Sequence, residues 1–369
     1  MSAPLDVCIR GAGVVGRTLA LLLARDRLRV GLLDAAPAGA ADAPDVRAYA
    51  INAASRDLLA QVRAWPADDA RAVTPVMRME VHGDDKGRVR FDAQEAGAPL
   101  AWIAGATTLL ARLQEAVRYQ PGIEVLAEPR EAPLTLICEG KASASRAGLG
   151  VHYEVTRYGQ HAIAARLACE LPHGQVARQW FAEGHILALL PLDGPEGRSV
   201  ALVWSVRQDQ AAELLDLPAS EFEERLTRAS HGSLGRLTLE SERAGWPLQL
   251  ARASHWCGPG WALAGDAAHT VHPLAGQGLN LGLADARELA RVLHEREYWR
   301  GLGDPRLLRR YERARKSQVI TMQWATDGLQ QLFVHDAPAW SWLRNWGMRG
   351  FERSGPLKQW AARQAAGRL

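Results

Sequence analysis

A carboxylate and a set of glycines mark the part of this chain best suited to chemistry. Gly265 and Asp266 end a short apolar run that begins at Trp261, and a glycine-rich segment around Gly278 comes soon after. A strand would then deliver an acid, and bare backbone would open the helix predicted over 279–293. The first turn of such a helix presents unpaired N–H groups and a partial positive charge. We therefore expect an anionic part of a cofactor or substrate to bind here.

Two histidines inside this stretch raise the question of a metal. His269 and His272 lie three residues apart, so on a helix they would share a face. However, no cysteine or carboxylate completes a ligand set, and Pro273 interrupts the helix. We predict structural or cofactor-edge roles for both histidines and no metal site. Two further histidines, His161 and His173, are expected on strand surfaces rather than as general bases.

A second cluster of glycines, near the N-terminus, predicts nucleotide binding. Its members are Gly11, Gly13 and Gly16. They directly follow a short apolar strand, a helix continues over 19–24, and the next strand, 28–33, ends on Asp34. This order of elements is the setting in which such glycines bind a dinucleotide. The first glycine would allow the tight turn and the second would let the backbone approach a pyrophosphate. The third would let helix and strand pack closely, and the acid would hold ribose hydroxyls.

Two arginines border this unit. Arg10 stands at the strand end, where a small or apolar residue is usual, so a buried guanidinium there needs a partner unless it faces the phosphates. Arg47 could meet a phosphate or a ribose at the mouth of the groove. A solvated loop arginine is an equally good interpretation of its position.

Composition narrows the class of protein. The 369 residues can form one large domain or two interleaved ones, and 47% hydrophobic and 23% charged residues are typical of a soluble globular protein. The net charge of +3 is too small to indicate nucleic acid as the main partner. The four cysteines are scattered, and neither a signal segment nor a run of about 18 apolar residues is present. We therefore expect a reduced, cytoplasmic protein.

The middle of the chain predicts a second lobe. Alternating apolar and polar residues over 77–92, interrupted by glycines, indicate a β-hairpin. Short strands separated by turns repeat from 153 to 206, which indicates an antiparallel sheet. Because this sheet interrupts a βαβ nucleotide unit, we predict an α/β protein of two lobes between which the chain crosses more than once.

The residues from Gly265 to Asn280 carry a resemblance to a known family. They resemble the flavoprotein aromatic hydroxylases of the para-hydroxybenzoate hydroxylase fold, and most of all their ubiquinone-biosynthesis branch. Further similar stretches are Tyr158–Ile163, Pro172–Gly174, Leu189–Leu192, Leu202–Ser205, Tyr311–Arg313 and Ala325–Phe333, so that the resemblance covers nearly the whole chain. It implies a Rossmann-like FAD-binding domain (1–72, 100–157 and 247–325), an interleaved antiparallel-sheet substrate domain (73–99 and 158–246) and a C-terminal helical segment (326–369).

The same resemblance implies FAD as cofactor and gives roles to individual residues. Gly11, Gly13 and Gly16 would hold the FAD pyrophosphate, Asp34 (more often Glu in this family) the adenosine ribose, and Asp266 the ribityl chain or the pyrophosphate region. The catalytic residues would be Pro273, Gly276 and Gln277, which with Leu274 lie against the isoalloxazine. Further cofactor-binding residues would be Arg47, Glu139, Gly278 and Asn280, with Glu139-Gly140 in place of the family's Asp-Gly motif.

The implied reaction is that of an FAD-dependent monooxygenase in ubiquinone biosynthesis. NADH or NADPH would reduce the flavin, dioxygen would add at C4a to give a hydroperoxide, and the aromatic ring of a polyprenyl phenol would be hydroxylated. Three departures from the family's pattern, together with Arg10, support an alternative. Glu139-Gly140 replaces the Asp-Gly motif, Gly105-Ala106-Thr107 replaces a Glu-Asn-Arg-like stretch, and the 123–139 segment is shorter than the family's strand meander. The second hypothesis is therefore a weakly flavinated or non-catalytic paralogue that serves as an accessory or scaffold protein in the same pathway.

The C-terminal stretch from Trp340 to Arg363 mixes tryptophans with positive charge. One interpretation is a helix that packs its tryptophans on the core and leaves its arginines in solvent. The other is a helix that lies on anionic lipid, as a peripheral contact at the inner face of the membrane. Polyprenylated substrates reside in the bilayer, so the second interpretation would explain their delivery. A complex with other enzymes of the pathway is a further expectation.

Overall fold

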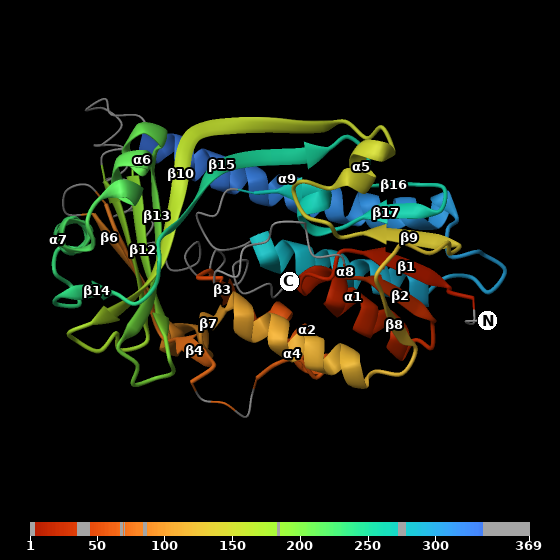
Figure 1. Ribbon diagram of the computed structural model, residues 1–369, viewed down its shortest axis with the longest axis horizontal. Coiled ribbons are helices and arrows are strands. Elements are labelled where there is room, and N and C mark those ends of the chain that lie inside the picture. The colour runs from red at the N-terminus through yellow and green to blue at the C-terminus, as the bar shows by residue number, and fades with distance from the viewer. Residues whose placement is uncertain are drawn as a thin grey trace.

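The computed structural model describes residues 4–34, 45–66, 69, 71–83, 87–182, 185–271 and 278–334, with side chains as far as Ile320. Figure 1 shows two large sheets of different geometry side by side, a short-stranded one on the right and a long-stranded one on the left. The long strands β10 (Tyr153–Cys169) and β15 (Ala244–Ala253) and the helix α9 (Pro305–Val334) run along the top of both sheets. The α/β architecture predicted from the sequence is confirmed.

The first sheet has six strands and is mainly parallel. Its order is β16 (Cys257–Gly258), β17 (Trp261–Leu263), β9 (Leu134–Ile137), β1 (Val7–Arg10), β2 (Val30–Leu33) and β8 (Ile123–Leu126). Only the β16–β17 pair is antiparallel. Because the carboxyl ends of parallel strands meet at one edge, the segments that follow β1, β2, β9 and β17 come together there. Ligands of open α/β sheets bind at such an edge.

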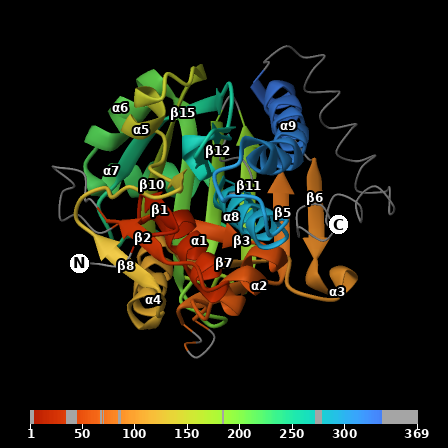
Figure 2. The ribbon, with the colours of Figure 1, turned by 90° about the vertical axis from the view of Figure 1, so that its right-hand side faces the viewer.

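Helices bury this sheet. Helix α1 (Val14–Arg25) lies between α4 (Ala106–Tyr119) and α8 (Gly278–His294), and α8 also contacts α2 (Ala53–Gln61) and α9 (Pro305–Val334). Figure 2 shows α1, α8, α2 and α4 gathered at this end of the molecule. The residues of β1, β2 and β9 are almost all apolar and buried, which is the pattern of a sheet covered on both faces.

The second sheet has nine strands and is mainly antiparallel. Its strands are, in spatial order, β18 (His269–Thr270), β15 (Ala244–Ala253), β10 (Tyr153–Cys169), β13 (Ser199–Arg207), β12 (His185–Leu192), β11 (Val176–Ala182), β5 (Arg78–His82) and β6 (Arg88–Asp92), with β14 (Leu237–Leu239) beside β10. Only β11 and β5 pair in parallel. The predicted hairpin and antiparallel strands are confirmed.

The outer face of the nine-stranded sheet carries its own core. Helices α6 (Gln208–Asp216) and α7 (Ala219–Ala229) lie on it, away from the parallel sheet (Figure 1). Alternate residues of β10, such as Ile163 and Leu167, pack with Phe222 and Leu226 of α7 in one buried cluster. This is the period of two that a sheet with one covered face shows.

A small sheet lies between the two large ones. Its order is β3 (Ala48–Ile51), β7 (Ala101–Gly105) and β4 (Val73–Val76), all antiparallel. A buried cluster joins it to the nine-stranded sheet through Val76, Ile103 and Leu192. The short helices α3 (Ala93–Ala96) and α5 (Ala144–Gly148) and the 3-10 turn η1 (Gly265–Ala267) complete the described elements. The domain boundaries given above stay a prediction.

One histidine lies elsewhere than expected. The prediction of a surface position for His173 is wrong, because its side chain is completely buried. Its Nδ1 accepts a hydrogen bond from the backbone N–H of Gln175 (3.0 Å), and its Nε2 lies 2.8 Å from the carbonyl oxygen of Leu192. The ring therefore pairs with a backbone N–H of the turn between β10 and β11 and with a backbone carbonyl oxygen at the end of β12.

No helix among the described residues is long and apolar enough to cross a membrane.

Candidate cofactor site

The glycine turn after β1 is shaped by close backbone packing. Gly11 has a φ of +104°, and a Cβ there would lie 2.5 Å from the carbonyl oxygen of Cys138. A Cβ on Gly16 would lie 1.9 Å from the carbonyl oxygen of Gly11. Both positions therefore require glycine for the turn to pass between α1 and β9.

Gly13 differs from its two neighbours in the motif. It precedes α1 with a φ of −72°, which any residue can adopt, and a Cβ there would meet nothing within 4 Å. No side chain caps the N-terminus of α1. Open space in front of uncapped backbone N–H groups is where an anion such as a pyrophosphate binds. The geometry thus fits the predicted FAD, and the assignment of these glycines to it stays a prediction.

Asp34 follows β2 at the same edge of the sheet. Its Oδ2 accepts a hydrogen bond from Nη2 of Arg17 over 2.8 Å, while 40% of the side chain remains exposed. Arg17 lies in the first turn of α1 and was not among the predicted site residues.

Asp266 follows β17 and lies in the turn η1. Its carboxylate is partly buried and makes no hydrogen bond with any described residue, although Tyr153 Oη donates to its backbone carbonyl (2.9 Å). Burial raises the pKa of this carboxyl, against the lowering effect of the charges on Lys141, His269 and Arg47. A carboxylate without a protein partner at a binding edge is suited to a hydroxyl-bearing ligand.

Close packing brings this turn to the N-terminal end of α1. A Cβ on Gly282 would lie 2.7 Å from Cγ2 of Val15 and 3.4 Å from the Cα of Gly265. Glycine at position 282 therefore lets α8 approach α1 and the turn together. The two glycine-rich segments, far apart in the sequence, meet at one place.

A buried charged cluster holds the backbone of the η1 turn. Asp285 of α8 is fully buried; its Oδ2 accepts hydrogen bonds from the backbone N–H of Gly265 (2.9 Å) and from Nε2 of His269 (2.7 Å). Its Oδ1 accepts from Nε of Arg315 (2.7 Å). Burial alone would raise the pKa of Asp285, but His269 and Arg315 outweigh it and lower the pKa. His269 is thus part of a structural cluster, stacked on Trp256 with ring centroids 4.9 Å apart.

A second brace comes from α5 and the start of β10. Arg146 donates from Nη1 to the carbonyl oxygen of Ala267 (3.0 Å), and its guanidinium lies 3.5 Å over the ring of Tyr153. Tyr153 and Arg146 thus hold the backbone that follows the Asp266 side chain, and Asp285 holds the backbone before it at Gly265. Neither Arg146 nor Tyr153 was among the predicted site residues.

Glu139 lies at the carboxyl end of β9 and closes a network with Arg10. Its carboxylate accepts hydrogen bonds from Ser143 Oγ (2.7 Å), Ser145 N (3.0 Å) and Ser145 Oγ (2.6 Å). Arg10 donates from Nη1 to Ser145 Oγ (2.9 Å), so one nitrogen of the guanidinium has a partner, whereas its buried Nε has none among the described residues. Burial would raise the pKa of Glu139, but the hydrogen bonds from Ser145 and Ser143 lower it overall.

Two other predicted residues have protein partners. Arg47 is half-exposed and pairs with both carboxylate oxygens of Asp45 (2.8 and 2.6 Å). Asn280 is buried; its Oδ1 accepts from the backbone N–H of Asn52 (3.1 Å), and its Nδ2 donates to the carbonyl of Ala50 (2.8 Å). The amide thus fastens α8 to the β3–α2 junction. Cofactor contacts of Arg47 and Asn280 stay predictions.

Of the predicted residues that remain, Gly278 is described and is the first residue of α8. His272, Pro273, Leu274, Gly276 and Gln277 lie outside the described residues.

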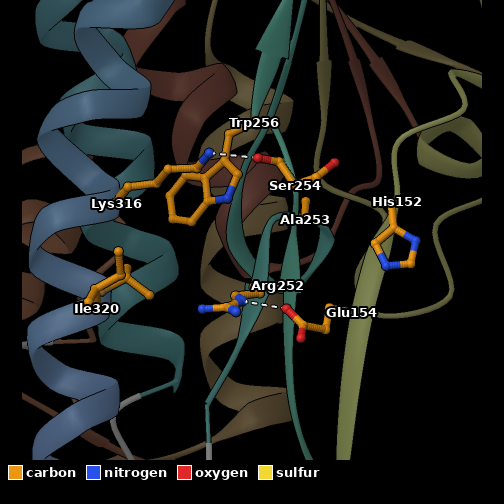
Figure 3. A pocket seen from close by; sticks show the side chains of 9 residues that line it. His152, Glu154, Arg252, Ala253, Ser254, Trp256, Lys316 and Ile320 are labelled. Carbon is orange, nitrogen blue, oxygen red and sulfur yellow. Dashed lines mark hydrogen bonds and ion pairs between the residues drawn. The ribbon is translucent and has the colours of Figure 1, made fainter.

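A pocket elsewhere on the molecule is separate from this site. It lies where the β10–β15 ribbon faces α9, and its lining contains none of the predicted cofactor residues. Figure 3 shows Arg252 paired with Glu154 on the neighbouring strand (2.8 Å) and Lys316 turned to the carbonyl oxygen of Ser254 (2.8 Å). Its charged groups are thus engaged with the protein.

A family model and several named proteins are similar to this chain. A family model described as an FAD binding domain matches residues 128–323. The 3-demethoxyubiquinol 3-hydroxylase of Escherichia coli is 31% identical, over 99% of this chain and 99% of its own length. Ubiquinone hydroxylase UbiL of Rhodospirillum rubrum is 31% identical over 99% of this chain and 90% of its own. The ubiquinone biosynthesis monooxygenase COQ6 of Drosophila melanogaster is 28% identical over 98% and 90%.

Solved structures of other proteins are similar to this chain in fold. PqsL of Pseudomonas aeruginosa in complex with 2-aminobenzoylacetate has a TM-score of 0.77 and 22% identity, covering 94% of this chain and all of its own. The p-nitrophenol 4-monooxygenase PnpA of Pseudomonas putida has a TM-score of 0.76 and 17% identity, covering 99% and 98%.

Proposed function

Since this chain belongs to the FAD-dependent hydroxylases of ubiquinone biosynthesis, we propose that it hydroxylates the aromatic ring of a polyprenyl phenol with NADH or NADPH as reductant. The observation that carries the proposal is the meeting of two segments at one edge of the parallel sheet. The open space at Gly13 and the unpartnered carboxylate of Asp266 lie on those segments. The names of the relatives supply the substrate class.

Three parts of the chain would hold FAD. The uncapped N-terminus of α1, with Gly13 in front of it, would bind the pyrophosphate. Asp34 would accept a hydrogen bond from the adenosine ribose, and Asp266 from a hydroxyl on the ribityl side. When bound, the flavin supplies the activation of dioxygen; the protein orients the phenol and excludes water.

The chain's own residues prepare this site before any ligand arrives. Asp285 and Arg146 hold the backbone on the two sides of Asp266, so the segment that carries its carboxylate is fixed by the protein's own hydrogen bonds. Preorganised charge of this kind contributes most where water is excluded. The site is thus built around backbone that hydrogen bonds within the protein already hold.

A direct test combines spectroscopy and product analysis. The purified protein is reconstituted with FAD and given NADPH or NADH, a polyprenyl phenol with a shortened tail, and isotopically labelled dioxygen. We expect a flavin spectrum and a product whose ring carries one labelled oxygen atom. A colourless protein that FAD cannot reconstitute, or one that forms only hydrogen peroxide, would favour the accessory paralogue instead.

We further propose that the C-terminal Trp/Arg segment, 340–363, places the protein as a peripheral contact on the inner face of the membrane. Its sequence alone supports this, because it lies outside the described residues. By the same reasoning about a bilayer-bound substrate, we propose that the protein joins a complex with other enzymes of the pathway.

A further inference from the structure

Arg17 occupies an unusual position for a cation. It lies in the first turn of α1, directly after Gly16, and only 9% of its side chain is exposed. Its Nε donates to the carbonyl oxygen of Ala12 over 2.5 Å, and its Nη2 donates to Oδ2 of Asp34 over 2.8 Å. One side chain therefore joins the glycine turn after β1 to the acid after β2.

Local physics opposes a positive charge here. The N-terminus of a helix carries a partial positive charge, so a cation in the first turn is unfavourable. Burial of a guanidinium is a second cost unless it is paired. Every other residue from Val14 to Ala24 is uncharged. Helix formation alone therefore does not account for Arg17.

The guanidinium also has donors to spare. Of the five N–H donors of an arginine, the structure assigns one on Nε and one on Nη2. The others have no partner among the described residues. The guanidinium itself lies between the glycine turn before α1 and a carboxylate that is 40% exposed.

We infer that Arg17 is a positioning residue for the adenosine half of FAD, which rests on the proposed FAD dependence. It holds Asp34 through Oδ2 and leaves Oδ1 to accept a hydrogen bond from the ribose. The pair also accounts for the aspartate where the resembling family more often has glutamate. Because the guanidinium fixes the carboxylate beside the glycine turn, the shorter side chain suffices.

The matched variants are Arg17→Met and Arg25→Ala. Methionine keeps the length and apolar stem of the buried side chain, so α1 can still pack. Arg25 lies in the last turn of the same helix and donates to the carbonyl of Gln61, away from the edge where the cofactor would bind. Urea unfolding of the apo forms establishes that both variants fold.

The decisive measurement is the Kd of FAD and of an FAD analogue that lacks the adenosine 2′-hydroxyl. We expect Arg17→Met to weaken FAD binding about tenfold and Arg25→Ala to leave it unchanged. Removing the hydroxyl should weaken binding to the wild type and to Arg25→Ala, but much less to Arg17→Met, because that variant no longer orients Asp34. The variant Asp34→Ala should likewise lose the discrimination between the two cofactors.

Two outcomes have separate meanings. If the folded Arg17→Met variant binds FAD as tightly as the wild type and still discriminates against the analogue, Arg17 is only a structural clamp and the inference is overturned. If the wild type itself binds no FAD, the proposed function fails, and the inference with it. The wild-type titration distinguishes the two cases before any variant is measured.

Discussion

Asp285 accepts a hydrogen bond from the backbone N–H of Gly265 over 2.9 Å and thereby ties α8 to the turn that carries Asp266. The same carboxylate is shared with His269 and Arg315, and all three side chains are buried. A buried carboxylate is tolerated only when its charge and its lone pairs are satisfied. The turn at which we propose a cofactor contact is therefore held by a cluster of buried side chains.

Removal of the Asp285 carboxylate should strongly destabilise the turn that carries Asp266. Asp285→Ala leaves the guanidinium of Arg315, the ring of His269 and the N–H of Gly265 buried without their partner. We expect a loss of about 3–5 kcal/mol in the free energy of unfolding, measured by urea denaturation of the apo protein.

The control is Glu295→Gln, which removes a half-exposed partner of Arg291 just beyond the same helix. A surface pair of this kind contributes about 0–1 kcal/mol. A comparable loss in the two variants would show that the buried cluster has no special part in stability.

Local patterns explain which parts of the site could be predicted. The turn at Gly11–Gly16 and the acid at Asp34 are specified by neighbours along the chain, so their spacing is visible in the sequence. Asp285 and Arg315 pair across 30 residues, and nothing in either neighbourhood indicates the other. The one signal of a buried pair in the sequence was that Asp285 lies on the apolar face of the helix predicted over 279–293.

Arg17 and His173 show a second limit. Both are polar residues that the fold buries completely or nearly so. Residue type favours a surface position for each, and only tertiary contacts with backbone carbonyls and a carboxylate reverse that preference. Strand and helix assignments were less affected, because the apolar periodicity that predicts them is also what drives burial.

The two glycines Gly13 and Gly16 should respond in opposite ways to alanine. Gly16→Ala would place a Cβ 1.9 Å from the carbonyl oxygen of Gly11, so we expect a poorly folded protein. Gly13→Ala meets nothing within 4 Å, so the apo protein should unfold at an unchanged urea concentration or a slightly higher one. Its methyl group would instead enter the space assigned to the pyrophosphate, and FAD should bind at least tenfold more weakly. Normal FAD affinity in Gly13→Ala would place the pyrophosphate elsewhere.

Asp266 should make the stability of the apo protein depend on pH. Burial raises its pKa in the folded state above the ordinary 3.8. The folded state then binds the proton more tightly, so the stability contributed by the neutral form is lost as the pH rises from 3.8 through the raised pKa. Asp266→Asn, which is never charged, should equal the wild type near pH 4 and become progressively more stable than it towards neutrality. Urea midpoints between pH 4.5 and 7.5 measure the difference, and a constant difference would contradict the assignment.

The same residue should be needed for the cofactor. Asp266→Ala removes the carboxylate that would accept from the ribityl side, and the loss of one charge-assisted hydrogen bond corresponds to about tenfold or more in the Kd of FAD. Flavin content of the purified protein gives the first readout. Unchanged flavin stoichiometry would refute the role.

Glu139 should show the opposite dependence on pH. Its pKa is lowered in the folded state, because hydrogen bonds from Ser145 and Ser143 outweigh burial. Its contribution is therefore present above the ordinary value of 4.5 and lost as the pH falls through the lowered pKa. Glu139→Gln should be less stable than the wild type by about 1 kcal/mol at neutral pH, a value reduced by partial exposure. The two proteins should converge on acidification; a gap that widened below pH 4.5 would exclude this account.

The C-terminal segment provides a test of membrane contact that is independent of flavin chemistry. Each arginine close to an anionic surface contributes about 1 kcal/mol of binding, or roughly fivefold in affinity. Full-length protein should therefore co-sediment with vesicles that contain phosphatidylglycerol, less with phosphatidylcholine alone, and less at high salt. Truncation after Asp336 should abolish the pelleting. The charge reversal Arg344→Glu with Arg349→Glu keeps every tryptophan, so it should remove the lipid dependence if the arginines meet lipid, and leave it intact if the tryptophans alone anchor the segment. Equal pelleting of full-length and truncated protein would mean that the segment packs on the protein instead.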